Sequence, residues 1–186
     1  MPKPGGYRKA AVAVILGGLL AAGCATRPES GPAAATEVSG MKISSPAFQT
    51  GQPIPARYTC DGEDLSPALS WSGVPAGAKS LAMICEDPDA PMGTWVHWIV
   101  INILPAASGI PESGPLPAGA VEVKNSFGKT AYGGPCPPGG THRYFFRLYA
   151  LDTERLDTLT LANYRTQLQP HILAQAEWMG TYRRNR

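Results

Sequence analysis

From Met41 to the C-terminus, the sequence consists of short apolar runs separated by clusters of proline and glycine. The clusters lie near residues 51–55, 73–77, 88–93, 111–119 and 133–140. Proline lacks a backbone N–H and glycine weakens regular structure, so these clusters interrupt the chain before a long helix can form. The chain has 21 glycines and 19 prolines, and only 16% of its residues are charged, which suits short strands and many turns. The pattern predicts an all-β sandwich that forms a single domain.

Three segments are the best candidates for strands, namely Ser80–Cys85, Trp95–Ile103 and Tyr144–Leu151. Each is rich in β-branched or other apolar residues and is bounded by residues that break strands. The first is almost continuously apolar, so both of its faces are expected to be buried. We therefore expect Ser80–Cys85 to lie at the centre of a sheet.

The C-terminal region has a different apolar pattern. The apolar residues at roughly helical spacing are Leu168, Ile172, Leu173 and Ala176. They predict two short helices within residues 161–178, with Pro170 between them or at the start of the second. Gly180 is expected to end the second helix.

The N-terminus has the features of an export signal. Three basic residues, Lys3, Arg8 and Lys9, precede an uncharged run over residues 10–23, which is shorter than the roughly 20 apolar residues that a transmembrane helix needs. The run ends in LLAAGC, where small residues precede Cys24. The pattern predicts a lipoprotein signal peptide at residues 1–23 and a lipid-modified Cys24, with an ordinary secreted form as the alternative.

Residues 24–40 carry no apolar periodicity and are rich in alanine, proline, glycine, serine and threonine. They are expected to form a flexible tether between a lipid anchor at Cys24 and a folded domain at residues 41–186. Ala25, rather than aspartate, follows the cysteine, and this favours sorting to the outer membrane in a bacterium with two membranes. The expected location is therefore the bacterial cell envelope, with the domain anchored to the outer membrane and facing the periplasm.

The net charge gives no indication of a nucleic-acid partner. The formal charge is +2, but Lys3, Arg8 and Lys9 belong to the predicted signal peptide. Without them, 13 basic residues face 14 acidic ones, so the remaining chain is slightly acidic. Nucleic-acid-binding domains are usually strongly basic, and we expect no such partner here.

Two of the three histidines lie beside turn-rich polar segments. His97 lies in WVHW, shortly after DPDAP, which contains Asp87 and Asp89. In a regular strand His97 shares a face with Trp95 and Ile99, because side chains alternate. A histidine among aromatic residues is more often a core residue than a functional one, and an Asp-Pro segment is often only a turn. The proximity of the two motifs makes a site more plausible than either does alone.

The other histidine, His142, follows the loop GGPCPPGG, which has four glycines and three prolines. Such a loop exposes backbone N–H groups that can converge on an anion. It lacks the lysine and the spacing of a nucleotide-binding phosphate loop. By itself, the loop is weak evidence for an anion site.

Taken together, DPDAP, WVHW and GGPCPPGGTHRY resemble the signature regions of the phosphatidylethanolamine-binding protein (PEBP) family, in its bacterial Raf-kinase-inhibitor-like (YbhB/YbcL-type) branch. The resemblance extends to YTCDGEDLSPALSW at residues 58–71 and to HILAQAEWMGTY near the C-terminus. It implies a PEBP-like β-sandwich with short peripheral and C-terminal helices. It also implies a pocket at one end of the sandwich that accepts phosphate-like anions or phospholipid headgroups.

Carried over residue by residue, the resemblance predicts eight ligand-binding positions: Asp87, Asp89, Trp95, His97, Gly134, Pro135, His142 and Tyr144. A protonated His97 and the hydroxyl of Tyr144 can donate to phosphate oxygens. Asp87 is expected to orient a histidine or to bind the ammonium group of a ligand. The loop between Asp89 and Trp95 is shorter than in eukaryotic relatives, so kinase binding does not follow from the resemblance.

Three cysteines remain besides Cys24. Cys85 lies in an apolar strand and is expected to be a buried free thiol. Cys60 and Cys136 both lie in turn-rich loops and are candidates for a disulfide, although the sequence does not fix their geometry.

The expected function is that of a non-enzymatic binding protein without catalytic residues or a cofactor, and a Raf-kinase-inhibitor-like regulator is one form of such a protein. One alternative is a hydrolase that uses aspartate, histidine and tyrosine side chains, but the sequence has no G-x-S-x-G motif. A metal site is not expected either, because no H-E-x-x-H or C-x-x-C pair is present. A further alternative is a protease or kinase inhibitor that acts through its surface.

Overall fold

The structure is a computed structural model, and it describes residues 40–184. The predicted signal peptide at residues 1–23, the lipidation site Cys24 and nearly all of the tether lie outside the described residues. Within residues 40–184, no helix is both long enough and apolar enough to span a membrane.

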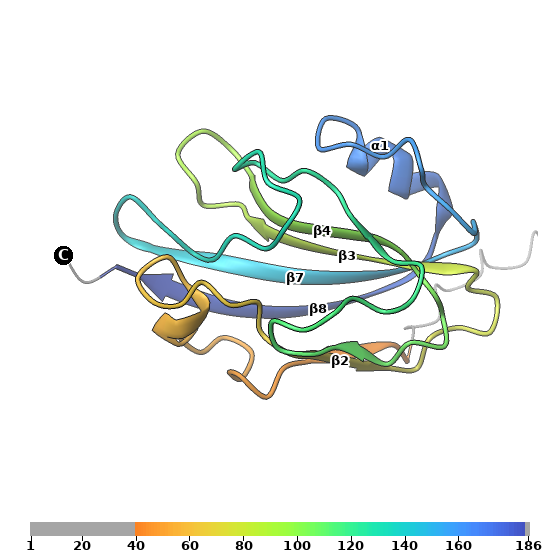
Figure 1. Ribbon diagram of the computed structural model, residues 1–186, viewed down its shortest axis with the longest axis horizontal. Helices are drawn as coiled ribbons and strands as arrows, with labels where there is room; N and C mark the ends of the chain where they lie inside the picture. The colour runs from red at the N-terminus through yellow and green to blue at the C-terminus, as the bar shows by residue number, and fades with distance from the viewer. Residues whose placement is uncertain (1–39, 185–186) are drawn as a thin grey trace, which may run out of the picture. The chain divides into compact units, whose positions relative to one another are not determined.

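The described residues form two antiparallel sheets that pack face to face, which confirms the predicted β-sandwich (Figure 1). The smaller sheet has the order β1 (Lys42–Ser44), β2 (Leu69–Ser72) and β5 (Gly109–Ile110). The larger sheet has the order β6 (Val121–Glu122), β4 (Trp95–Ile103), β3 (Ser80–Asp87), β7 (Thr141–Leu151) and β8 (Ile172–Arg183). One short helix, α1 (Tyr164–Leu168), and two 3-10 turns, Ala56–Tyr58 and Gln169–His171, complete the fold.

Strand β3 lies at the centre of the larger sheet, as its apolar sequence predicts. Its alternate residues enter two separate cores. Met83 packs in the main core between the two sheets, whereas Ile84 packs in a second core on the opposite face. The second core also contains Leu168 of α1, so the helical segment covers the outer face of the large sheet. The burial of both faces explains why β3 is continuously apolar rather than alternating.

The prediction of a second C-terminal helix is wrong. The first helix exists as α1 and is followed by the 3-10 turn that contains Pro170, but residues 172–183 form the long strand β8. Strand β8 pairs with β7 along its whole length, from Ile172 opposite Leu151 to Arg183 opposite Thr141. This ladder of backbone hydrogen bonds outweighs a local helical spacing that is only a few residues long.

Gly180 likewise does not end a helix. It lies buried in β8 opposite Tyr144, where the chain approaches a neighbouring segment closely. A Cβ atom at this position would lie 2.5 Å from Cγ1 of Ile54 and 2.6 Å from Cε2 of Phe48. Glycine is needed here because a side chain would collide with the core.

A β-bulge in β4 sets the orientation of His97. Cys85 pairs with Trp98 and Glu86 pairs with Val96, so His97 is an extra residue without a direct partner on β3. The bulge leaves His97 on the side of Trp95, as predicted, but it places Ile99 in the second core on the opposite face. The expectation that Ile99 shares the face of His97 is therefore wrong, because a regular alternation does not continue through a bulge.

Candidate functional site

The loops at one end of the large sheet enclose a cavity of about 290 Å³. The loops are the β3–β4 connection at residues 88–94 and the segment 125–140, and they lie at the left of Figure 1. The lining residues are Asp87, Ala90, Pro91, Met92, Trp95, His97, Phe127, Cys136, Pro137, Pro138 and His142. Four of the eight predicted ligand-binding residues, Asp87, Trp95, His97 and His142, are thus brought together in one cavity.

Asp87 and His142 form a buried pair in the wall of the cavity. Oδ2 of Asp87 lies 2.7 Å from Nδ1 of His142, and the two side chains are only 4% and 7% exposed. The other carboxylate oxygen, Oδ1, accepts a hydrogen bond of 2.8 Å from the backbone N–H of Asp89. The carboxylate thus fixes both the histidine ring and the first turn of the β3–β4 loop.

His97 is held from the opposite wall. Its Nδ1 lies 2.6 Å from the carbonyl oxygen of Gly133, and a carbonyl oxygen can only accept, so Nδ1 carries the proton. In a neutral ring, Nε2 then has a lone pair. Burial lowers the pKa of His97, and this outweighs the hydrogen bond to Gly133 and the charge of Asp87, which both act to raise it. The ring is therefore neutral at pH 7 in the free protein.

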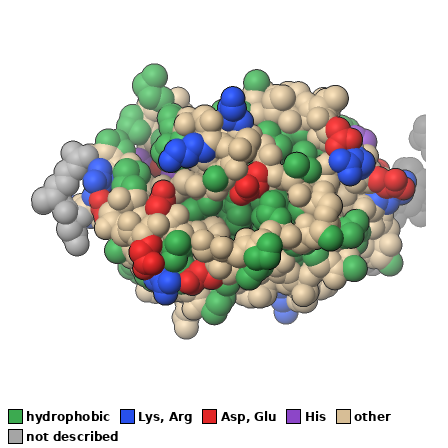
Figure 2. All heavy atoms as spheres, viewed as in Figure 1, with side chains coloured by type: hydrophobic (Ala, Val, Ile, Leu, Met, Phe, Trp, Pro, Cys, Tyr) green, Lys and Arg blue, Asp and Glu red, His purple; other side chains and the backbone are tan. Residues whose placement is uncertain are grey.

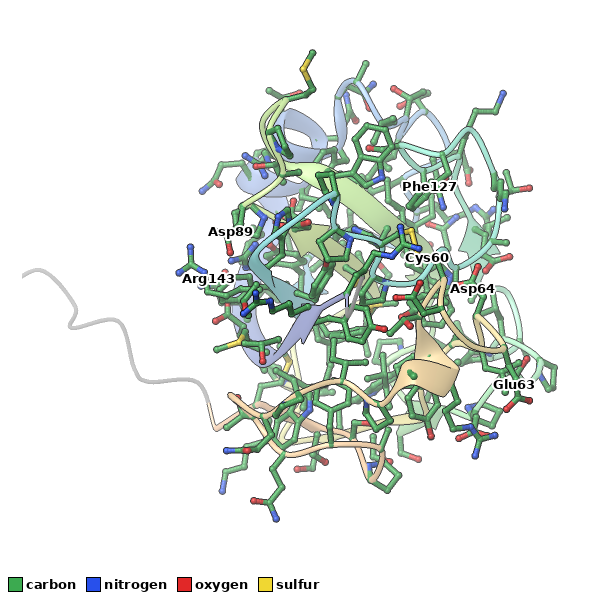
Figure 3. All side chains as sticks on the ribbon, turned by 90° about the vertical axis from the view of Figure 1, so that its left-hand side faces the viewer. Cys60, Glu63, Asp64, Asp89, Phe127 and Arg143 are labelled. Atoms are coloured by element: carbon green, nitrogen blue, oxygen red, sulfur yellow. A yellow bond between two sulfur atoms is a disulfide. The ribbon has the colours of Figure 1, made fainter. Side chains whose placement is uncertain are left out.

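Asp89 does not line the cavity but anchors its rim. Its carboxylate accepts two hydrogen bonds from the guanidinium of Arg143, at 2.9 and 2.7 Å, and one from the backbone N–H of Arg143. The hydrogen bond to Arg143 lowers the pKa of Asp89 to about 2. Figure 3 shows the two side chains side by side at this end of the molecule. Asp89 thus ties the β3–β4 loop to the start of β7.

Gly134 and Pro135 lie behind the cavity wall rather than in its lining. The N–H of Gly134 donates to Oδ1 of Asp64 over 2.7 Å, and the carbonyl of Pro135 accepts from the N–H of Cys60 over 3.2 Å. A Cβ atom on Gly134 would lie 2.5 Å from both Oδ1 of Asp64 and the carbonyl oxygen of Tyr58. In the structure, Gly134 and Pro135 position the wall of the cavity, and the N–H of Gly134 is not available to a ligand because it donates to Asp64.

Cys60 and Cys136 are joined by a disulfide, and Cys85 is a buried free cysteine. The Cα atoms of the bonded pair lie 5.4 Å apart, although 76 residues separate them in the sequence. Cys136 lines the cavity, so the disulfide links its wall to the segment that carries Asp64 (Figure 3).

Asn125 and Phe127 belong to the site although no sequence motif marks them. Asn125 is 1% exposed and donates to the carbonyl oxygens of His97 and Ala131, at 2.9 and 2.8 Å. Its Oδ1 accepts from the backbone N–H groups of Phe127 and Lys129. The ring of Phe127 then packs edge-on against His97, with the ring centroids 5.3 Å apart. A polar residue in a loop without a known motif offers no signal for such a role.

Tyr144 lies beneath His97, with the ring centroids 5.1 Å apart, and does not line the cavity. Its hydroxyl is completely buried and lies close to the carboxylate of Asp87, without a hydrogen bond of good geometry among residues 40–184. Burial and the charge of Asp87 raise the pKa of this hydroxyl far above its usual value. The hydroxyl is thus a neutral donor beside the carboxylate of Asp87.

Removing this hydroxyl is expected to change the stability of the free protein only slightly. For Tyr144→Phe we expect the free energy of unfolding to change by less than about 1 kcal/mol, because the loss of a poorly aligned contact with Asp87 is offset by the loss of a buried polar group. The matched control is Tyr164→Phe. The hydroxyl of Tyr164 donates to the buried Glu86 and accepts from Arg165, so we expect a decrease of about 1–3 kcal/mol. Urea denaturation measures both changes, and a loss of stability in Tyr144→Phe as large as that in Tyr164→Phe would mean that the Tyr144 hydroxyl is fully hydrogen-bonded to Asp87.

The chain is similar to known proteins over nearly all of its described residues. The family model described as phosphatidylethanolamine-binding protein matches residues 44–183. A UPF0098 protein of Methanothermobacter thermautotrophicus is 51% identical over 151 residues, which cover 77% of this chain and 99% of the relative. A UPF0098 protein of Chlamydia trachomatis is 43% identical over 152 residues, covering 78% of this chain and all of the relative.

Two crystal structures also resemble the chain. The PEBP homologue CT736 of Chlamydia trachomatis has 43% sequence identity and a TM-score of 0.73, covering 79% of this chain and 99% of that one. The YbcL protein of E. coli, described as a new member of the mammalian PEBP family, has 35% identity and a TM-score of 0.72, covering 78% and 99%.

The expected location at an outer membrane, facing the periplasm, is wrong. Relatives with 51%, 48% and 40% identity come from Methanothermobacter, Archaeoglobus and Pyrococcus, which are archaea and have no outer membrane. The expectation depends on a rule for sorting lipoproteins after the cysteine, which applies only to bacteria with two membranes. Archaeal relatives do not support the use of that rule for this chain.

The family match thus extends from the start of β1 to the end of β8, and it includes every residue that lines the cavity. The Methanothermobacter relative, matched over almost its entire length, has about half of its residues in common with this chain. The chain belongs to the phosphatidylethanolamine-binding protein family.

Proposed function

We propose that this protein is a non-enzymatic binding protein whose cavity holds a phosphate-like anion, either free or as the headgroup of a phospholipid. One observation carries the proposal: His97, His142 and Asp87 converge in a small cavity that is otherwise apolar. Few polar groups in an apolar cavity are typical of a site that orients a small ligand. The proposed binding domain, residues 41–186, contains the whole cavity.

A protonated His97 supplies the positive charge that an anion needs. No lysine or arginine is among the residues that line the cavity. Because Nδ1 of His97 is bonded to Gly133, protonation of the ring adds a donor at Nε2. Such a charge-assisted donor binds phosphate oxygens strongly. The buried carboxylate of Asp87 adds a site for an ammonium group, so a ligand with both an amine and a phosphate suits the cavity.

The composition of the cavity wall favours binding over hydrolysis. None of the residues that line the cavity is a serine, a threonine or a lysine, and the lining Cys136 is held in a disulfide. Covalent catalysis needs a nucleophile with an adjacent base. The pair Asp87–His142 has no such partner among the residues that line the cavity.

Anion binding is expected to weaken as the pH rises. The affinity for the anion is present in full below the pKa of His97 in the free protein, because there the ring is already protonated. Above this pKa, binding requires proton uptake, and the affinity falls about tenfold per pH unit. Since burial lowers this pKa from its usual value of about 6.5, the decrease begins below pH 6.5. Calorimetric titration of the full-length chain with phosphoethanolamine at several pH values measures the effect.

Two control ligands and two variants make this test specific. Sulfate keeps its charge over this pH range, so it separates titration of the protein from titration of phosphate, and glycerol serves as the uncharged ligand. His97→Gln is expected to lose at least about tenfold in affinity, since it removes the charged donor. His171→Gln is the matched control, because His171 lies outside the cavity and pairs with Asp152 at the surface. Absence of saturable binding to either anion at any pH would refute the proposed function.

A further inference from the structure

A single peptide group in the cavity wall connects His97 with Asp64. The carbonyl oxygen of Gly133 lies 2.6 Å from Nδ1 of His97. The N–H of Gly134 donates to Oδ1 of Asp64 over 2.7 Å. This carbonyl and this N–H belong to the same peptide group, which is planar and trans, so they point in opposite directions. One plane of atoms therefore links the carboxylate of Asp64 to the ring of His97.

Asp64 is held in an uncommon backbone conformation for this contact. Its φ is +59°, in the left-handed region that residues other than glycine seldom adopt. Among the described residues, its carboxylate takes part in no ion pair and accepts one hydrogen bond, from the N–H of Gly134. Uncommon backbone conformations persist where the surrounding structure holds them, and they cluster at functional sites. The contact with the cavity wall is therefore a candidate for the function of Asp64.

The two glycines allow the peptide group to turn unless a contact holds it. A Cβ atom on Gly133 would lie 2.7 Å from the ring of Phe127, so a side chain there is excluded. Two successive glycines give the peptide group between them little intrinsic preference for one orientation. In the reverse orientation, the N–H of Gly134 would point towards His97, and the carbonyl of Gly133 would face the carboxylate of Asp64. Two acceptors repel each other, so Asp64 selects the orientation that the structure shows.

The orientation of this peptide group decides which nitrogen of neutral His97 carries the proton. A carbonyl oxygen beside Nδ1 requires the proton there, whereas an N–H group would require a lone pair and would move the proton to Nε2. With the proton on Nδ1, Nε2 has a lone pair, which repels an anion until the ring is protonated. With the proton on Nε2, the neutral ring would already offer a donor.

The other titratable groups around His97 do not make this choice. Asp87 of β3 is bonded to His142 of β7 and to a backbone N–H, and Tyr144 of β7 packs edge-on against the ring of His97. Burial lowers the pKa of His97, and the charges of Asp87 and Asp64 are among the influences that act to raise it. Figure 2 shows acidic and basic side chains mixed at the left of the molecule, where the cavity lies. A local contact, rather than a surface of one sign, therefore controls the ring.

We infer that Asp64 is a positioning residue for the anion site. Through the Gly133–Gly134 peptide group, it keeps the proton of neutral His97 on Nδ1, so that the site gains its donor at Nε2 only when the ring is protonated. Asp64 does not line the cavity and acts through His97. The inference rests on the proposed function, because it identifies the residue that makes binding of the anion depend on pH.

Nitrogen-15 NMR of the full-length chain at pH 7 tests the inference directly, because the shifts of the two ring nitrogens identify the tautomer. In the wild type we expect the proton of His97 on Nδ1. Asp64→Gly removes the carboxylate and adopts a positive φ without strain, so the ratio of the Nε2–H form to the Nδ1–H form should rise at least about tenfold. The tautomer of His142, which is bonded to Asp87, is the internal reference and should not change.

Two further variants separate the contact from the charge. The amide of Asp64→Asn can accept or donate, so it supports both orientations, and we expect a response between those of the wild type and Asp64→Gly. Glu63→Gln is the matched control, because it removes the neighbouring charge, which lies 3.9 Å from Arg57 and not at the wall. Figure 3 shows Glu63 further from the disulfide than Asp64. Urea denaturation verifies the fold of each variant, and Asp64→Asn carries the test if Asp64→Gly does not fold.

The same proteins are titrated with sulfate over the pH range. In Asp64→Gly the neutral ring can donate from Nε2, so the affinity should fall less than about threefold per pH unit above the pKa of His97, against about tenfold in the wild type. Glu63→Gln should behave like the wild type. A wild-type proton on Nε2, an unchanged tautomer in Asp64→Gly, or an unchanged slope with a changed tautomer would overturn the inference.

Failure of the proposed function gives a different result. If the wild type binds no anion at any pH, the anion site is refuted, and the NMR spectra still decide whether Asp64 positions His97. If the wild type binds sulfate and the tautomer does not respond to Asp64→Gly, the anion site stands and the role of Asp64 is refuted.

Discussion

Replacing Cys60 and Cys136 by alanine is expected to lower the free energy of unfolding by roughly 4 kcal/mol. The disulfide connects residues that are 76 positions apart, so it restricts a large loop of the unfolded chain. Loss of this restriction favours the unfolded state, and the effect grows with the length of the loop. Urea denaturation of the full-length chain, followed by tryptophan fluorescence, measures the change. Reduction of the wild-type disulfide by dithiothreitol should give a similar loss.

The same change should weaken anion binding. Cys136 lines the cavity, and without the disulfide its wall is joined to the segment around Asp64 only by hydrogen bonds, such as those of Gly134 and Pro135. The control for reduction is the double alanine variant, whose stability and affinity should not respond to dithiothreitol. Cys85→Ala separates loss of the disulfide from an effect on the buried thiol. A change of less than about 1 kcal/mol on reduction would contradict the expected restriction of the unfolded chain.

The sequence predicts the three long central strands well because each carries its own evidence. Strand β3 is continuously apolar and β4 is rich in β-branched and aromatic residues, and proline and glycine clusters mark their ends. These are local properties of the chain: β4 has the predicted bounds, and the structure extends β3 only at its end, to Asp87, and β7 only at its start, to Thr141. The central place of β3 also follows from its sequence, since only a strand between two layers can bury both faces.

Strand β8 could not be recognised in the same way. Its sequence ILAQAEWMGTYR contains alanine, glutamine and glutamate, which suit a helix better than a strand. The strand exists because β7 offers a partner along its full length, and this pairing depends on residues that lie far away in the sequence. The bulge at His97 has the same origin, because it reflects the register between β3 and β4 rather than a preference of WVHW.

The residues of the candidate site also differ in how far the sequence predicts them. Asp87, Trp95, His97 and His142 meet around one cavity because each lies in or next to the end of a strand that the sequence also predicts. The role of Asn125 depends on two carbonyl groups, one of which lies 28 residues earlier in the chain. Such contacts between a loop and a distant backbone atom leave no periodic pattern in the sequence.

Removal of the carboxylate of Asp87 is expected to destabilise the protein by about 2–5 kcal/mol, because it leaves two hydrogen-bond donors in the cavity wall without an acceptor. In Asp87→Ala, the buried Nδ1 of His142 loses its acceptor and the N–H of Asp89 loses its own. Asp87→Asn keeps an acceptor of the same shape in place, so we expect a smaller loss. Urea denaturation at pH 7 measures all three proteins.

The chain itself contains a control for this argument. Asp152 and His171 form the same contact at the same distance of 2.7 Å, but their side chains are 51% and 38% exposed, whereas those of Asp87 and His142 are almost fully buried. Water solvates both partners when the exposed pair is broken, so Asp152→Ala should cost less than about 1 kcal/mol. Because the residue types and the contact match, the difference between the two alanine variants reports the effect of burial, together with the loss of the bond from the Asp89 N–H. Equal losses in Asp87→Ala and Asp152→Ala would mean that the cavity wall is open to water, and this would contradict the desolvation that lowers the pKa of His97, on which the proposed pH dependence rests.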